Sequence, residues 1–343
     1  MGRVCQILGN PTKMARTAHF RSHEVFRCDH NKAPQFIAAV LFVPSVRAYA
    51  YSVSAVVRFA ISLLYSSWVI SPFARSSHLI RTTRGFLEGL PCAGKSTTAR
   101  YIAEQTGGAF FDEDCAEHPA DYTFHAFIPD GSEGFTAEET ALLRENGTPQ
   151  PGGIVVPLSR LSGELFNKAL KFKIYDFLDW KTERPVMLRK WQEFAERAGD
   201  GVNVFNCVLL QNPMCETMMR FGMPQEQSFE FIRDICSAIA PLEPVVIYLK
   251  SSDPASLVRS ALPERGNDWL NAVVDYHCSG EYGRSRGLSG FEGYIAALEE
   301  RQRRELEMLP QLPVKSFLLD DPQRDWNAAY SKIGELLRGK DEH

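Results

Sequence analysis

The residues whose types and spacing most directly suggest chemistry fit the pattern G-x-x-x-x-G-K-[ST]. They are Gly89, Leu90, Pro91, Cys92, Ala93, Gly94, Lys95 and Ser96, with Thr97 directly after them. The glycines let the backbone curl so that successive N–H groups point at an anion, and a following helix adds the positive end of its dipole. Lys95 can reach the β- and γ-phosphates of a nucleotide, and the Ser96 hydroxyl can hold Mg²⁺. The pattern therefore predicts a P-loop that binds ATP and Mg²⁺ through residues 89–97.

A second group of candidates is the acidic run Asp112, Glu113 and Asp114, which follows the short apolar run 108–111. If that run is a strand, the acids stand at the C-terminal edge of the sheet, where open α/β sheets bind ligands. One carboxylate could hold Mg²⁺ through water, and another could accept the proton of an attacking hydroxyl. We therefore treat Asp112 and Asp114 as catalytic candidates, and Ser96 with Asp112 as metal candidates. The alternative is a solvated acidic turn.

The elements around these residues predict how they are positioned. Residues 85–88 have the character of a strand end and residues 96–105 that of a helix, which Gly107 and Gly108 stop. Strand, P-loop, helix and second strand are the opening of a βαβ unit, which requires a parallel sheet. The expected fold class is a three-layer α/β P-loop NTPase domain, with a mostly parallel sheet of about five strands and helices on both faces.

Apolar patterning predicts the remaining elements. The best buried strand is 202–210, which ends in Gln211, and further strands are expected over 245–249 and 314–319. Helices are expected over 136–145, 162–180, 185–198, 225–240, 267–277, 291–309 and 326–337. The first of these opens with a capping box, and residues 280–290 form a glycine-rich, basic loop.

This combination resembles the small-molecule kinases of the P-loop class, namely the shikimate, gluconate, nucleoside and nucleoside-monophosphate kinases. The resemblance rests on the P-loop, on the D-x-D at 112–114 and on arginines in the late glycine-rich segment, and it covers about residues 79–340. Segments 118–122 and 211–216 also resemble poorly characterised bacterial P-loop proteins. The resemblance implies ATP-dependent phosphoryl transfer to a small-molecule acceptor that it does not identify.

The same resemblance implies roles for individual residues. Asp112 and Asp114 would associate with the metal or bind the acceptor, and Arg284 and Arg286 would be lid arginines that close over the phosphates. Two features depart from the kinase pattern. The strand expected to carry a Walker B acid ends in Gln211, and no Asp/Glu-Arg-Ser follows it. Metal would then be held by Ser96 with Asp112, Asp114 or water, and phosphorylation of nucleosides specifically is in doubt.

Lid arginines would come from the segment that contains Arg259, Arg265, Arg284, Arg286 and Arg301. Arginine suits this task because its planar guanidinium grips phosphate through two hydrogen bonds and keeps its charge. Glycines on both sides favour Arg284 and Arg286, although an arginine on a helix face is usually solvated. Arg220, soon after the central strand, is a candidate on the acceptor side.

A second class of function stays open on the sequence alone. A nucleotide-binding switch or regulatory protein with weak hydrolysis and a protein partner would carry the same P-loop. The inserted region of about 115–198 could bind either a small-molecule acceptor or such a partner. The facing P-loop and D-x-D favour the kinase.

The eight cysteines include no C-x-x-C and no set with zinc spacing, which indicates reduced thiols and a cytoplasmic protein. Cys92 is unusual inside a P-loop. Because it would stand near a helix N-terminus, we expect a lowered pKa and oxidation that blocks ATP binding.

Charge is unevenly distributed along the chain. Residues 1–80 carry nine basic and two acidic side chains, so 29 of the 38 basic and 40 of the 42 acidic residues follow them. An acidic body argues against binding to nucleic acid, which needs a basic surface. The patterning does not address the oligomeric state.

Residues 1–78 have no clear signals for elements and precede a kinase-like domain expected over 79–340. The apolar runs 36–43 and 59–73 fall short of the ~20 residues that a membrane-spanning helix needs. We expect a poorly ordered or loosely helical extension. A membrane anchor, a targeting peptide and an over-extended reading frame are the alternatives.

Overall fold

The computed structural model describes residues 84–113, 115 and 117–338. The expectations for residues 1–78 and for Asp114 lie outside these residues. Within the described part of the chain, no helix has the length and apolar character to cross a membrane.

The core is a five-stranded sheet in which every strand pairs in parallel, in the order β2-β6-β1-β7-β8. Its strands are β1 (Arg84–Gly89), β2 (Ala109–Phe111), β6 (Asn203–Asn206), β7 (Val245–Lys250) and β8 (Lys315–Asp320). The six residues of β1 are all buried, as expected for a central parallel strand covered on both faces. The fold class is confirmed: a parallel sheet with a P-loop after its central strand.

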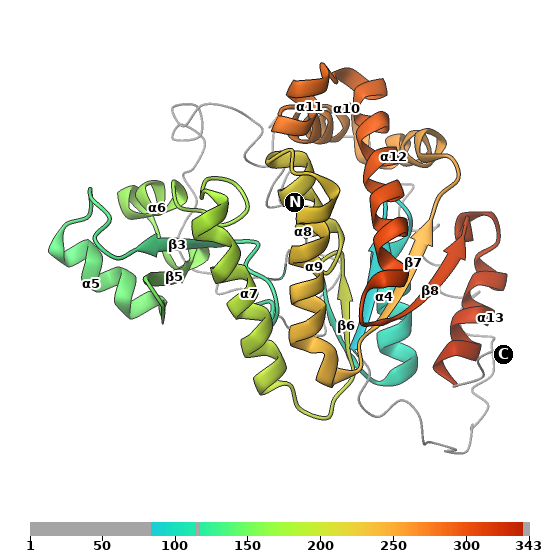
Figure 1. Ribbon diagram of the computed structural model, residues 1–343, viewed down its shortest axis with the longest axis horizontal. Coiled ribbons are helices and arrows are strands. Elements are labelled where there is room, and N and C mark those ends of the chain that lie inside the picture. The colour runs from blue at the N-terminus through green and yellow to red at the C-terminus, as the bar shows by residue number, and fades with distance from the viewer. Residues whose placement is uncertain (1–83, 114, 116, 339–343) are drawn as a thin grey trace, which may run out of the picture. The chain divides into compact units, whose positions relative to one another are not determined.

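Helices cover both faces of this sheet (Figure 1). Phe86 of β1 packs in a core shared with α7 (Trp180–Arg197) and α9 (Gln225–Ile239), whereas Leu87 packs with α4 (Lys95–Thr106) and α13 (Trp326–Leu337). Successive side chains of a strand point to opposite faces, so two adjacent apolar residues serve two different cores.

Helix α12 (Gly290–Met308) supplies residues to both cores, and α10 (Pro254–Cys278) packs beside it. Helix α10 is two helices joined at a kink, because Gly266 has a φ of 78° and a ψ of 170°. The segment 280–290, expected to be a loop, instead contains the helix α11 (Glu281–Arg286), which ends at Gly287 with a φ of 63°.

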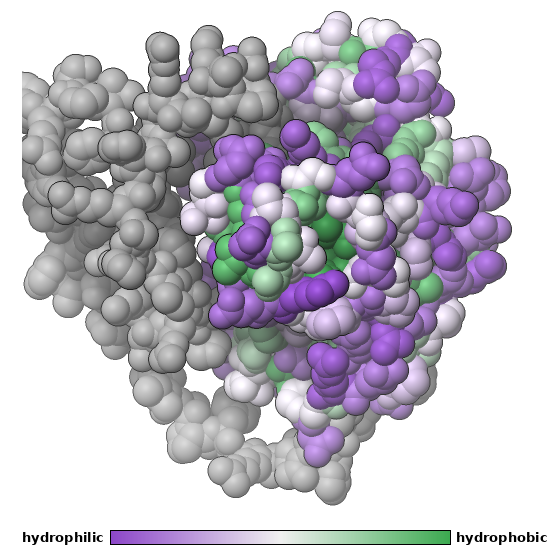
Figure 2. Space-filling model, turned by 90° about the vertical axis from the view of Figure 1, so that its left-hand side faces the viewer, coloured by the Kyte–Doolittle hydropathy of each residue, from purple (hydrophilic) through white to green (hydrophobic). Residues whose placement is uncertain are grey.

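An inserted lobe lies at the left of Figure 1 and has its own sheet. Its elements are β3 (His125–Pro129), α5 (Ala137–Asn146), β4 (Thr148–Gln150), β5 (Gly153–Pro157) and α6 (Gly163–Leu170). The three strands pair antiparallel in the order β3-β5-β4, and residues such as Ile128 and Val156 form a separate small core. Seen from this side, the described surface is mostly polar, with apolar side chains in a central hollow (Figure 2).

The lobe contains both a confirmed and a missed prediction. The capping box of α5 is present: the Glu139 N–H donates to Thr136 Oγ1 at 3.2 Å, and the Thr136 N–H donates to Glu139 Oε2 at 2.9 Å. The three strands were not predicted, because Pro129, Pro149 and Pro157 sit in or at the ends of these short segments. Their pairing with each other, rather than local propensity, makes them strands.

Two other expected elements end earlier than predicted. Strand β6 ends at Asn206 because Cys207 has a φ of 69°, and the chain then enters α8 (Gln211–Met214) and a π-helical turn, Cys215–Arg220. The helix expected over 162–180 ends at Leu170, and Tyr175 adopts a φ of 75° before α7 begins. At Cys207 a residue in the left-handed region ends the strand, although cysteine is not a type that favours this conformation.

Candidate active site

The loop between β1 and α4 requires glycine at both positions of the motif. Gly89 has a φ of 134°, and a Cβ there would lie 2.4 Å from the carbonyl oxygen of Leu249. Gly94 has a φ of 86°, and a Cβ there would lie 2.5 Å from the indole ring of Trp326. A side chain at either position would displace β7 or α13, so the shape of the loop depends on packing from the neighbouring elements.

Lys95 is held at this loop. Its side chain is 6% exposed, and its Nζ donates a hydrogen bond to the carbonyl oxygen of Leu90 at 2.6 Å. The ammonium therefore lies at the N-terminus of α4, where backbone N–H groups have no partner within the helix. A bound phosphate would offer the ammonium an anionic oxygen in place of that carbonyl.

Three side chains from separate elements meet next to the loop. The Nδ2 of Asn206 donates to the Oγ of Ser96 at 2.9 Å and to the Oδ1 of Asp112 at 2.6 Å. Asn206 ends β6, Asp112 follows β2, and Ser96 opens α4. The adjacent parallel strands bring the P-loop hydroxyl and the carboxylate to the same edge of the sheet.

Asn206 is the residue that sequence reasoning missed. We expected the strand to run to Gln211, so that Gln211 would replace a Walker B acid, and that placement is wrong. Gln211 lies in α8, where its Nε2 donates to Glu113 Oε2 at 3.0 Å. The signal for Asn206 was a polar side chain inside the apolar run 204–210.

The chemistry of this group fits Mg²⁺. A hydroxyl and a carboxylate are hard oxygen ligands, and phosphate oxygens and water can complete an octahedron around the ion. Within 84–113, 115 and 117–338, no group of three or more His, Cys, Asp or Glu side chains is placed to hold a metal. Ser96 and Asp112 would therefore hold the ion together with a bound nucleotide.

A network of buried charged and polar side chains supports the P-loop. Arg301, which the sequence offered as a lid candidate, is fully buried, and this expectation for it is wrong. Its NH2 donates to the carbonyl oxygen of Gly89 at 3.2 Å, and its Nε lies 3.2 Å from the Oε1 of Glu305. Tyr248 donates to the other oxygen of Glu305 at 2.6 Å. Arg301 thus holds the first residue of the P-loop in place.

Glu88, the residue before the loop, joins β1 to the segment that follows β6. Its two carboxylate oxygens accept hydrogen bonds from the N–H groups of Leu209 and Gln211, at 2.8 Å and 3.0 Å. Burial raises the pKa of Glu88 to about 7, while these N–H groups act to lower it. The carboxyl group therefore titrates near neutral pH inside the core.

The other predicted arginines occupy different places. Arg265, at the kink of α10, lies close enough to the P-loop for its charge to act on Cys92. Arg284 is exposed and donates to Ser279 O at 2.7 Å and to Glu281 Oε2 at 2.8 Å. The charge of Arg265 therefore acts at the loop, whereas Arg284 is bonded within its own segment.

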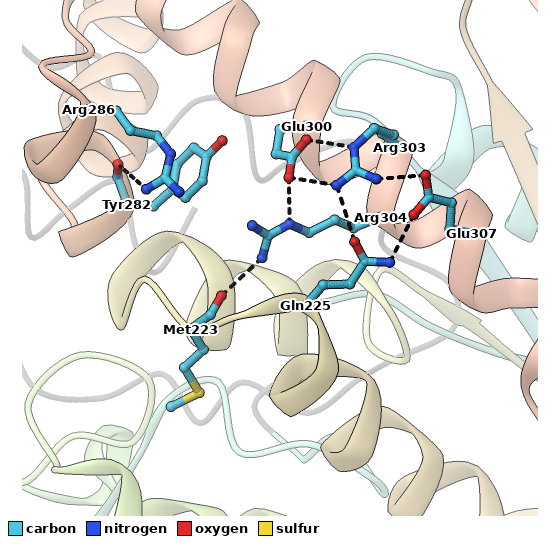
Figure 3. Close-up of polar contacts among 8 residues, drawn as sticks. All are labelled: Met223, Gln225, Tyr282, Arg286, Glu300, Arg303, Arg304 and Glu307. Atoms are coloured by element: carbon cyan, nitrogen blue, oxygen red, sulfur yellow. Dashed lines mark hydrogen bonds and ion pairs between the residues drawn. The ribbon is translucent and has the colours of Figure 1, made fainter.

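Figure 3 shows that Arg286 lies against its own helix. Its guanidinium stacks on the ring of Tyr282 at 3.9 Å and donates to the Tyr282 carbonyl oxygen at 3.4 Å. Beside it, Arg304 donates to Glu300 at 2.7 Å and to the Met223 carbonyl oxygen at 3.0 Å. The network continues through Arg303, Glu307 and Gln225. These bonds join α12 to the segment that leads into α9.

Burial also corrects the expectation for Cys92. Burial raises the pKa of its thiol, although the charges of Arg265 and Lys95 act to lower it. We expected a lowered pKa at this position. The desolvation of the sulfur outweighs the nearby positive charges.

A pocket of about 480 Å³ lies beside the π-helical turn and α11. It is lined by Tyr175, Asp176, Cys215, Met219, Arg220, Phe221, Tyr276, Ser279, Gly280, Glu281 and Arg284. Cys215 accepts a hydrogen bond from the NH1 of Arg301 at 3.5 Å, and Arg301 also holds Gly89. One buried arginine therefore connects the pocket wall to the P-loop.

Arg220 stands at the pocket above two buried carboxylates. Its NH1 lies 3.0 Å from Glu183 Oε2 and also contacts Glu216, and its NH2 donates to the Leu178 carbonyl oxygen at 2.5 Å. Burial raises the pKa of Glu183, and the charge of Glu216 raises it further, while Arg220 lowers it. The Tyr175 N–H donates to the other oxygen of Glu183 at 2.7 Å. The network fixes both Arg220 and the strained residue Tyr175 at the pocket.

Comparisons with known proteins add little to this geometry. No protein family and no curated protein matches the sequence. The structure of YorR protein in complex with phosphorylated GDP from Bacillus subtilis is 15% identical over 76% of this chain and 100% of that chain, with a TM-score of 0.35. Deoxyadenosine kinase from M. mycoides matches with bound dATP (16% identity, 73% and 99% coverage, TM-score 0.35) and with bound dCTP (16%, 75% and 99%, TM-score 0.36). These TM-scores are too low to carry an argument, so the strand order and the P-loop of the chain itself establish its fold.

Proposed function

We propose that this protein transfers the γ-phosphoryl group of ATP to a hydroxyl group of a small molecule. The observation that carries the proposal is the convergence of Ser96, Asn206 and Asp112 at one edge of the sheet. A nucleotide held by the P-loop would have a carboxylate beside it, fixed by an amide that also contacts the P-loop serine. A carboxylate in that place can accept the proton of an attacking hydroxyl.

The individual roles follow from the positions of the side chains. Residues 89–97 bind the phosphates through backbone N–H groups, and Lys95 adds its charge. Ser96 and Asp112 hold Mg²⁺, which neutralises charge on the β- and γ-phosphates when it is bound. Asp112, with Asp114 two residues on, orients the acceptor.

In this proposal some of the arginines act at the nucleotide and others at the pocket. Arg265 stands at the nucleotide, since its charge reaches the P-loop at Cys92. Arg284 lines the pocket, and Arg286 supports the same helix. In this proposal Arg265 and Arg284 approach the transferring phosphoryl group when α10 and α11 close, and Gly266 is the hinge.

The pocket beside Arg220 is the proposed acceptor site. The side chain of Arg301 connects the wall of this pocket to the P-loop. The pocket is lined by the aromatic rings of Tyr175, Phe221 and Tyr276 and by side chains of both charges. Such a lining suits a small polar molecule that has an apolar face.

The test is ADP release by the purified chain with ATP and Mg²⁺, in the presence of a panel of nucleosides, sugars and hydroxy acids. At least one acceptor should raise ADP release by more than about tenfold over ATP alone. Equal turnover with and without every acceptor would contradict the kinase proposal and favour a regulatory NTPase.

Two variants separate the steps. Lys95→Ala should abolish both basal hydrolysis and transfer, because the phosphates lose their point charge. Asp112→Asn should lower the rate of transfer to the acceptor by about 100-fold or more, while ATP binding persists. Glu113→Gln is the matched control, because its side chain faces Gln211 rather than Ser96.

A further inference from the structure

The pocket contains a thiol whose surroundings differ from those of the other described cysteines. Cys215 opens the π-helical turn, is 4% exposed and lines the pocket. Its Sγ lies 3.5 Å from the NH1 of Arg301 and 4.0 Å from the Nε2 of His277. A permanent positive charge and an imidazole nitrogen therefore meet at one sulfur atom.

The second ring nitrogen of His277 determines how the imidazole faces Cys215. Its Nδ1 lies 2.8 Å from the carbonyl oxygen of Val273, which can only accept a hydrogen bond. Nδ1 must therefore carry the proton, so in the neutral ring Nε2 has the lone pair that points to the sulfur. The geometry places a proton acceptor at the thiol.

A further buried polar group lies in the same place. The Tyr294 side chain is 0% exposed, and its hydroxyl has no hydrogen-bond partner among the described residues. Burial raises the pKa of Tyr294, whereas the charge of Arg301 acts to lower it. The Tyr294 ring also packs 5.0 Å from that of His277. An unused donor is therefore available to an oxygen atom added at the sulfur.

We propose that Cys215 is a site of oxidation by hydrogen peroxide, at which His277 removes the thiol proton and Arg301 and Tyr294 stabilise the product. The sulfur attacks one peroxide oxygen, so an S–O bond forms and the O–O bond breaks. Sulfur loses two electrons to the peroxide, and the thiol proton passes to the leaving hydroxide, which departs as water. The product is a sulfenic acid at the wall of the pocket.

Arg301 gives this reaction a consequence at the P-loop. The same guanidinium donates to Cys215 Sγ and to the Gly89 carbonyl oxygen. The oxygen of a sulfenic acid is a stronger hydrogen-bond acceptor than a thiol sulfur, so it would draw the guanidinium away from Gly89. Oxidation would then loosen the loop and weaken ATP binding.

The chain supplies its own control thiols. Burial raises the pKa of Cys236 to about 12, and the nearby carboxylate of Glu88 raises it too. Burial also raises the pKa of Cys207. Both are as buried as Cys215 but neither lines the pocket, so the variant His277→Gln is needed to separate the effect of the imidazole from that of access.

The test uses the full wild-type chain, graded hydrogen peroxide and the sulfenic-acid trap dimedone, with each cysteine peptide measured by mass spectrometry. Cys215 should be labelled more than about tenfold faster than Cys236 and Cys207. Labelling of Cys215 no faster than these controls would overturn the proposal. His277→Gln should slow the labelling of Cys215 by about tenfold, and an unchanged rate would remove His277 from the site.

A second measurement tests the coupling to the loop and does not depend on any acceptor. The Kd for ATP is compared before and after peroxide within each protein. It should rise more than about fivefold in wild type and in Cys92→Ser, but stay constant in Cys215→Ser. A peroxide effect that disappears in Cys92→Ser and persists in Cys215→Ser would overturn the coupling. Failure of the acceptor screen would leave both results standing.

Discussion

Two clusters in this protein each pair one arginine with buried glutamate, but their surroundings differ. Beneath the P-loop, Arg301 lies with Glu305 and holds the carbonyl oxygen of Gly89. Beside the pocket, Arg220 lies with Glu183 and Glu216 and holds the carbonyl oxygen of Leu178. In each, one guanidinium joins buried carboxylate to a backbone carbonyl group.

Their exposure separates them. The Arg301 side chain is 0% exposed, whereas that of Arg220 is 23% exposed and lines the pocket. A fully buried charge pair mainly fixes the groups around it, because its desolvation cost consumes most of its attraction. A partly exposed arginine keeps donors for a ligand. We infer that the first cluster supports the P-loop and that the second presents a charge to the pocket.

The largest expected effect comes from removing the buried arginine. Arg301→Met leaves the carboxylate of Glu305 without its cation and frees Gly89, and should lower the free energy of unfolding by about 3–5 kcal/mol. Urea denaturation measures this change. The matched control is Arg303→Met on the same helix, which removes exposed pairs with Glu300 and Glu307 and should cost less than about 1 kcal/mol. Equal losses would contradict the distinction.

The next largest expected effect is the pH dependence of folding stability that arises from Glu88, the residue before the P-loop. Its pKa of about 7 in the folded protein exceeds the ordinary 4.5, so the folded state binds more protons between these values. Stability is then greatest at acidic pH and falls by about 3 kcal/mol as pH rises from about 4.5 through 7. Urea denaturation at pH 5 and pH 8 should show this fall, and Glu88→Gln should remove most of it.

Glu307→Gln is the control for that measurement. Hydrogen bonds from Gln225 and Arg303 lower the pKa of Glu307, so its contribution is lost as pH falls and not between pH 5 and 8. A fall of the same size in Glu88→Gln would show that another group titrates in this range.

An intermediate effect is expected at the second cluster. Arg220→Met leaves Glu183 and Glu216 together, but water at the pocket and protonation of Glu183 relieve the repulsion, so the cost should be about 1–3 kcal/mol. The KM for an identified acceptor should rise by about tenfold while the Kd for ATP stays within about twofold. A larger change in ATP affinity than in KM would place Arg220 on the nucleotide side.

The smallest effects should separate two exposed arginines. Arg265→Ala removes the charge near the P-loop and should lower kcat by about tenfold. Arg286→Ala removes a guanidinium stacked on Tyr282 and should lower kcat by no more than about twofold. Steady-state ADP release with and without acceptor measures both, and the reverse order would place Arg286 rather than Arg265 at the phosphates.

The central part of the fold could be predicted from the local sequence. The P-loop pattern and the apolar run before Asp112 specified β1, α4 and β2, because glycine spacing and strand patterning are properties of neighbouring residues. The three strands of the inserted lobe were not visible in this way. Each is short and broken by proline, and it exists through its pairing with the others.

The sequence by itself determined a P-loop motif, a carboxylate at the end of β2 and a parallel sheet to carry them. Only the tertiary structure decided which arginine supports the loop, which lines the pocket, and that Asn206 joins Ser96 to Asp112. An arginine on a helix has the same local signature whether its face meets the core or water. Cys215 and His277, 62 positions apart, likewise meet only because α10 packs against the π-helical turn.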